Sequence, residues 1–117
     1  MSTGIQGSWY SVAGKGATTP VVIVADPGTG KAIKVLKTVT IVSTPNAGDS
    51  VSIQDSGGTP KIYAAHSGAA VATHVVDTTD SFGGSANTMA ESESLNAVFT
   101  GTTARYTIKV LAEIVDV

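Results

Sequence analysis

The chain has 117 residues, a formal net charge of −2 and only 14 % charged residues. This length suits one domain with its own core, and the charge lacks the basic excess by which proteins neutralise nucleic-acid phosphates. Cysteine is absent, which excludes disulfides, thiolate metal sites and a cysteine nucleophile.

The N-terminal segment comes first along the chain. Residues 1–19 are expected to form an extended arm ahead of a domain that covers residues 20–117, because glycines separate their apolar residues and leave Ile5, Trp9 and Tyr10 as isolated anchors. Two interpretations stay open: Trp9 and Tyr10 fold back as a first strand or cap of the domain's own core, or they contact another chain. No secretory signal and no apolar run of ~20 residues is visible, so no membrane partner is expected.

Alternating apolar and polar residues predict β-strands in the rest of the chain. The clearest stretch is residues 31–55, where the alternation stops at the turn residues 45–49 and then resumes, as in a β-hairpin. Residues 77–87 are expected to form a long loop, and residues 89–95 one or two helical turns. The predicted strands are 21–24, 32–42, 49–55, 61–65, 71–76, 95–100 and 104–115. The predicted fold is all-β: a small antiparallel β-sandwich of about seven strands with jelly-roll or immunoglobulin-like topology.

Lys37 does not fit the pattern of its strand. It falls on the same side of the ribbon as the apolar residues at positions 33, 35, 39 and 41. Either Lys37 extends to a sheet edge, or the register shifts at a β-bulge so that Leu36 points inward. We favour these interpretations over a functional buried lysine, because an unpaired ammonium group is costly in a core.

The stretch VVIVADPGTGKA superficially resembles a strand that enters a phosphate-binding loop. Ala25 stands where the first glycine of that motif belongs, and Ala32 stands where Ser or Thr would hold magnesium. The residues after Lys31 alternate as a strand, so the helix N-terminus that would face the phosphates is missing. No nucleotide site and no cofactor are expected.

The polar residues in the middle of the chain include types that bind metals or act in catalysis. His74 and Asp77 would lie on opposite faces of a strand, and no spacing places them side by side with His66 or Asp80, so no metal is expected. Serines are too plentiful for a Ser-His-Asp combination to be informative, and no G-x-S-x-G motif is present. The acidic residues at positions 91 and 93 are typical of a helix start or a loop edge. We therefore expect no catalytic residue and no enzymatic activity.

Several segments together resemble small virion proteins of tailed bacteriophages. They are GKAIKVL, TVTIVS, VSIQD, and ESESLN leading into AVFTGTTARYTIKVLAEIVDV, and the resemblance covers residues 30–117. The likeness is greatest to capsid decoration (cement) proteins. It concerns strand patterns, and it therefore transfers no catalytic or ligand-binding residue to this chain.

The resemblance implies a protein that binds the outside of a phage head and stabilises or decorates the lattice. Its partner would be the major capsid protein, it would form a homo-oligomer, as a trimer at local three-fold positions, and it would be made in the host cytoplasm before it joins the virion. Ile5, Trp9 and Tyr10 would then contact the capsid or a neighbouring protomer.

Two alternatives remain open. A tail or head-fibre module would present the loop over residues 77–87 to a host surface, with Asp77, Asp80 and Phe82 as exposed candidates. A carbohydrate-binding β-sandwich would rely on Trp9, Tyr63 or Phe82 as an aromatic platform.

Overall fold

The computed structural model describes residues 7–15, 20–67, 73–77, 88–101 and 103–117. These residues form eight β-strands and no helix. The strands are β1 (Ser8–Lys15), β2 (Val21–Val24), β3 (Lys31–Thr44), β4 (Ser50–Asp55), β5 (Ile62–Ser67), β6 (Thr73–Asp77), β7 (Leu95–Thr100) and β8 (Arg105–Asp116). The all-β prediction is confirmed, and the seven predicted strands are present with small differences at their ends.

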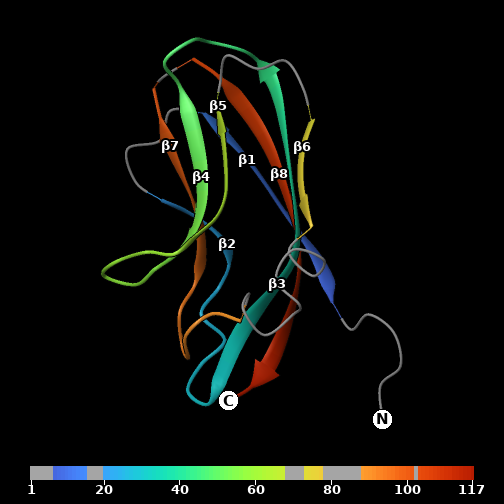
Figure 1. The fold of residues 1–117 in the computed structure, drawn as a ribbon, viewed down its shortest axis with the longest axis vertical. Helices are drawn as coiled ribbons and strands as arrows, with labels where there is room; N and C mark the ends of the chain where they lie inside the picture. The colour runs from blue at the N-terminus through green and yellow to red at the C-terminus, as the bar shows by residue number, and fades with distance from the viewer. Residues whose placement is uncertain (1–6, 16–19, 68–72, 78–87, 102) are drawn as a thin grey trace.

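The strands form two four-stranded sheets (Figure 1). Sheet A has the order β1-β8-β3-β6, and sheet B has the order β2-β7-β4-β5. Every neighbouring pair is antiparallel. The long strands β3 and β8 are therefore neighbours at the centre of sheet A.

The two sheets share one apolar core, as in a β-sandwich. Alternate residues of β8 in sheet A and of β4 and β7 in sheet B are buried there, because successive side chains of a strand point to opposite faces. The ring of Phe99 in sheet B lies against the ring of Tyr106 in sheet A, with 5.5 Å between their centroids. Removal of this apolar area from water stabilises the packing of the sheets.

Residues 8–15 belong to sheet A, which corrects the predicted arm over residues 1–19. They form β1, which pairs with β8 along its whole length, so the segment folds back as a first strand; Tyr10 packs against the core, and Trp9 stays exposed. The pairing satisfies backbone groups that an exposed edge of β8 would leave without partners. A Cβ on Gly14 would lie 3.2 Å from Cζ of Phe99, so this glycine lets β1 approach the core. The same glycine obscured the strand pattern in the sequence.

A β-bulge in β3 explains the position of Lys37. Val35 pairs with Ala112, and Lys37 pairs with Leu111, so Leu36 is the extra residue. The predicted bulge is confirmed. Leu36 is buried but does not belong to the core cluster: its Cδ1 and that of Leu111 both lie 3.0 Å from where a Cβ on Gly7 would be.

The bulge also reverses which residues of β3 face the core. The sequence pattern predicts Val39 and Ile41 on the core side. Instead, Thr38 and Thr40 are buried, with 0 % and 1 % of their surface exposed, whereas Val39 and Ile41 are only partly buried. One inserted residue shifts the alternation by one position, and every later side chain of the strand changes face.

Residues 88–94 run beside the start of β3 without forming a helix, so the predicted helical turns are wrong. The backbone N–H of Met89 donates to the carbonyl of Ile33 at 2.8 Å, and that of Ser92 donates to the carbonyl of Lys31 at 2.9 Å. These donors are thus satisfied by β3 rather than by the preceding turn of a helix.

Candidate functional site on the outer face of sheet A

One side of sheet A faces away from the core, and the strand register identifies its residues. Residues directly opposite each other in an antiparallel pair lie on the same face. Trp9 and Lys37 flank Leu111, and Val39 is opposite Lys109. We call this surface the outer face. Its apolar members are Trp9, Val39, Ile41, Val75 and Leu111, and the register places six charged residues on it: Lys34, Lys37, Asp77, Arg105, Lys109 and Glu113.

Trp9 is the aromatic side chain of the outer face, and 55 % of its surface is exposed. It borders a shallow recess of about 510 Å³, together with Ser11, Val39, Lys109 and the neighbouring Tyr10. A tryptophan placed in this way combines exposed apolar area with an indole N–H donor, and such side chains are frequent at contacts with partners. The recess combines the apolar side chains of Trp9 and Val39 with the polar Ser11 and Lys109.

The other predicted contact residues do not join Trp9. Tyr10 is partly buried and packs against the core, because it follows Trp9 on the strand and points to the opposite side. Ile5 lies outside the described residues. Of the three predicted contact residues, Trp9 is the described one that is exposed.

The three residues predicted to be exposed on a loop, Asp77, Asp80 and Phe82, are not brought together either. Asp77 was assigned to an exposed loop, but it is the last residue of β6 and lies opposite Lys37 in the register. Asp80 and Phe82 lie outside the described residues. The structure therefore brings none of the three to a described loop.

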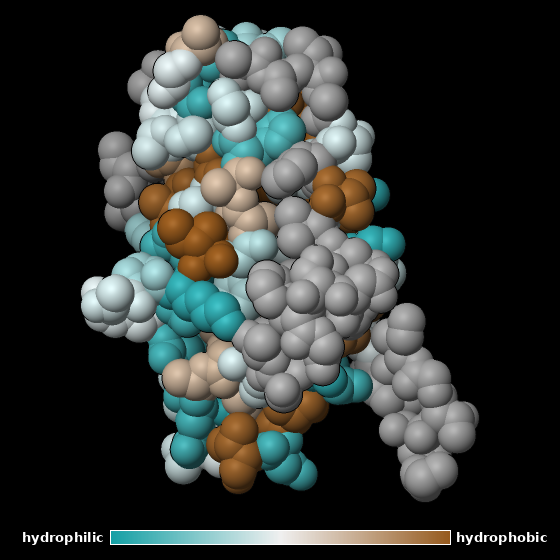
Figure 2. All heavy atoms as spheres, in the orientation of Figure 1, coloured by the Kyte–Doolittle hydropathy of each residue, from teal (hydrophilic) through white to brown (hydrophobic). Residues whose placement is uncertain are grey.

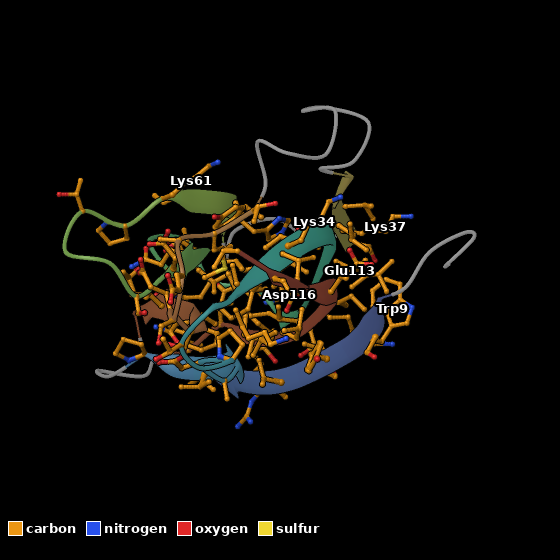
Figure 3. The ribbon with its side chains drawn as sticks, turned by 90° about the horizontal axis from the view of Figure 1, so that it is seen from below. Trp9, Lys34, Lys37, Lys61, Glu113 and Asp116 are labelled. Carbon is orange, nitrogen blue, oxygen red and sulfur yellow. The ribbon has the colours of Figure 1, made fainter. Side chains whose placement is uncertain are left out.

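Positive charge gathers on the outer face. Lys34, Lys37, Arg105 and Lys109 lie on it, and they are four of the seven Lys and Arg residues of the chain. Two acidic residues are placed among them by the register: Glu113 directly opposite Lys34, and Asp77 directly opposite Lys37. Figure 3 shows Trp9 and Lys37 on one side of the molecule and Lys61 on β5 on the other. The outer face is thus positive in a chain whose net charge is −2.

Apolar side chains elsewhere on the surface are dispersed. In the view of Figure 2, brown patches are small and lie apart among polar side chains. Val22 and Ile62 are more than half exposed, but they lie on β2 and β5, the two opposite edges of sheet B. The outer face differs from them because its apolar residues lie on neighbouring strands.

Asp49 forms a buried polar site with a structural role. Its carboxylate accepts hydrogen bonds from the backbone N–H groups of Ala104 at 2.7 Å and Thr103 at 2.9 Å. These bonds stabilise the charged form and lower the pKa of the Asp49 carboxyl below its ordinary value of 3.8. The site joins the turn before β4 to the turn before β8.

The buried tyrosines offer no base for catalysis. Burial, with the negative charges of Asp55 and Glu93, raises the pKa of Tyr63 to about 12, and burial with Asp49 raises the pKa of Tyr106. Both hydroxyls stay protonated at neutral pH. Tyr63 is also buried, which removes it from the residues proposed as a sugar platform.

A second recess of about 300 Å³ lies at the far end of sheet A, beside Gly14, Ser43, Arg105 and Thr107. Among the described residues, no group of three or more His, Asp or Glu side chains is arranged to hold a metal ion. The described part of the chain also has no helix that is long and apolar enough to cross a membrane.

Comparison with known proteins gives no match: no family model, no curated protein and no solved structure matches the chain. The description of the site therefore depends on the chain's own residues.

The sequence reasoning missed most of the outer face. Val39 was placed on the apolar side of its strand, and Leu111 was not singled out within the strand predicted over residues 104–115. The signal that pointed to the face was Lys37, because a lysine on the apolar side of a strand indicates a shift of register.

Proposed function

We propose that the chain is a structural virion protein that binds the outside of a phage head through the outer face of sheet A. The observation that carries the proposal is the exposed Trp9 beside Val39 and Leu111, on the side of the four-stranded sheet A that faces away from the core. A surface of this kind suits a contact with another protein, because aromatic anchors on a rigid support bind with little loss of conformational entropy. The resemblance of residues 30–117 to phage decoration proteins supports the same role.

We infer further that the sandwich is of the jelly-roll type. Strands β1, β3, β6 and β8 lie in one sheet and β2, β4, β5 and β7 in the other. In an immunoglobulin sandwich the first strand pairs with the second, whereas β1 here pairs with β8. Eight-stranded jelly rolls occur in viral capsid and lectin domains, so this topology is in keeping with a virion role.

A trimer at local three-fold positions is part of the proposal. Closed symmetry would present three outer faces to the lattice at once, and multivalent contact raises the apparent affinity without a new contact in each protomer. The mass of the protein in solution tests the proposed trimer: the mass of three chains supports it, and the mass of one chain at all concentrations contradicts it.

The main test uses purified heads of the phage whose genome encodes the chain, prepared without this protein. Trp9→Ala should reduce occupancy of the heads while the melting temperature of the free protein stays the same. Removal of residues 1–6, which leaves β1 in place, measures the contribution of Ile5 separately. If the wild-type protein does not bind the heads, the proposed function is wrong.

A carbohydrate-binding role is the second candidate, and the exposed Trp9 also favours it. An indole beside a shallow recess can stack on a sugar ring. A glycan array separates the two roles: sugar binding that Trp9→Ala abolishes, without binding to heads, would favour this candidate.

A further inference from the structure

Acidic side chains of this protein accept hydrogen bonds from its own backbone. Four carboxylates bind groups of the chain itself. Asp26 accepts from the N–H of Gly28, Asp49 from Thr103 and Ala104, Asp55 from Gly57 and Lys61, and Glu91 from Gly30. Such bonds satisfy buried or turn N–H groups and fix the loops. Much of the negative charge is therefore engaged in local structure.

Among the described side chains, the lysines of the outer face form no ion pair with a carboxylate. Within the described side chains, no carboxylate lies within ion-pair distance of Lys34, Lys37 or Lys109, whereas Lys31 forms an ion pair with Asp116. Lys109 has Ser11 on one side and Val39 on the other, with no acidic residue opposite it. Lys34 and Lys37 each have an acidic residue opposite them in the register, whereas Lys109 has none. Lys109 is thus the cation that borders the apolar recess without an acidic residue opposite it.

We infer that the outer face binds a protein surface on which Asp and Glu carboxylates surround an apolar patch; this inference rests on the proposed function. Charge complementarity carries it, because a positive border around Trp9 and Val39 matches a negative border around an apolar centre. A phosphate polymer fits less well. The rest of the chain is net negative, and the centre of the face is apolar rather than a continuous basic strip.

The complementarity predicts a dependence on salt. Lys109 lies beside the recess that Trp9 borders, so its charge acts within a Debye length of any group seated there, which is about 10 Å at 0.1 M salt. Attraction to carboxylates would therefore weaken as salt rises, while the contact of Trp9 would persist.

Lys109→Glu tests the inference, with Lys61→Glu as a matched control. Both variants change the net charge equally, but Lys61 lies on β5 of sheet B, with its Nζ 5.3 Å from the centre of the Tyr63 ring (Figure 3). Binding to the purified heads is measured at about 50 mM and about 500 mM NaCl. We expect Lys109→Glu to weaken binding about tenfold at the lower salt and much less at the higher salt. Lys61→Glu should change it less than about twofold.

Lys109→Gln keeps the test valid if the reversed charge disturbs folding. It removes the cation without adding an acid, and we expect binding to weaken about threefold at low salt. Equal melting temperatures of the variants show that the folded protein is being compared.

The outcomes separate the inference from the proposed function. One outcome is that the heads bind the wild type but not Trp9→Ala, and bind Lys109→Glu with the same affinity as Lys61→Glu. The inferred carboxylate-bearing partner surface is then wrong, and the head-binding role stands. Absence of wild-type binding at both salt concentrations overturns the role itself. Binding of double-stranded DNA or anionic vesicles that Lys109→Glu abolishes would also overturn the inference, because the positive border would then serve phosphates.

Discussion

Lys37 lies opposite Leu111 on the outer face of sheet A, because Leu36 occupies a β-bulge immediately before it. The bulge removes the lysine from the core side of the strand and turns Val39 outward with it. A single extra residue thus supplies both a cation and an apolar side chain to the candidate binding surface.

The reversed alternation of β3 can be tested with two equal truncations. Val35→Ala should lower the free energy of unfolding by about 2–3 kcal/mol, because Val35 is fully buried before the bulge. Val39→Ala should lower it by less than about 1 kcal/mol, because Val39 lies on the outer face. Chemical denaturation measures both values. Equal losses would mean that Val39 lies in the core and that the register is different.

Thr38 offers a stabilising substitution. Its hydroxyl is buried and has no hydrogen-bond partner among the described residues. Thr38→Val replaces the hydroxyl with a methyl group of similar size and should raise the free energy of unfolding by about 1 kcal/mol. Thr38→Ala should lower it, because a small cavity remains. A loss of stability with valine would show that the hydroxyl does have a partner.

Position 101 requires a glycine for two reasons, its positive φ and the close approach of the Asp49 side chain. Its φ is 88°, and a Cβ there would lie 1.8 Å from Oδ1 of Asp49. Gly48 has a φ of 93° but open space around it, so Gly48→Ala should cost only the backbone strain, about 1 kcal/mol. Gly101→Ala should cost clearly more in the same denaturation experiment. If both variants lose a similar free energy of unfolding, the approach of Asp49 does not explain the need for glycine at position 101.

The stability of the protein should depend on the ionisation of Asp49. Its pKa is lowered in the folded state, so its contribution is complete above the ordinary value of 3.8 and is lost as the pH falls through the lower, folded pKa. The melting temperature should therefore fall below about pH 4, and the fall should be smaller in Asp49→Asn, which cannot titrate. Parallel melting curves of the two proteins between about pH 2 and pH 7 would contradict this assignment.

The strand pattern could be predicted from the sequence where side chains alternate without interruption. β8 is an example, since its core residues Tyr106 and Ile108 alternate with polar ones. The first strand was only one of two open interpretations, because Gly14 has no side chain to mark a face, although its close approach to Phe99 is what the fold requires. The outer face was missed because the bulge at Leu36 moves later residues to the other side, and only long-range pairing with β8 determines that shift.

A cryo-EM reconstruction of heads saturated with the protein tests the central claim most directly, because it shows which face of the sandwich meets the lattice. We expect the outer face of sheet A to lie against the capsid, with Trp9 buried in the contact and Lys109 next to acidic side chains. A reconstruction in which sheet B or a strand edge meets the capsid, with Trp9 open to solvent, would contradict it.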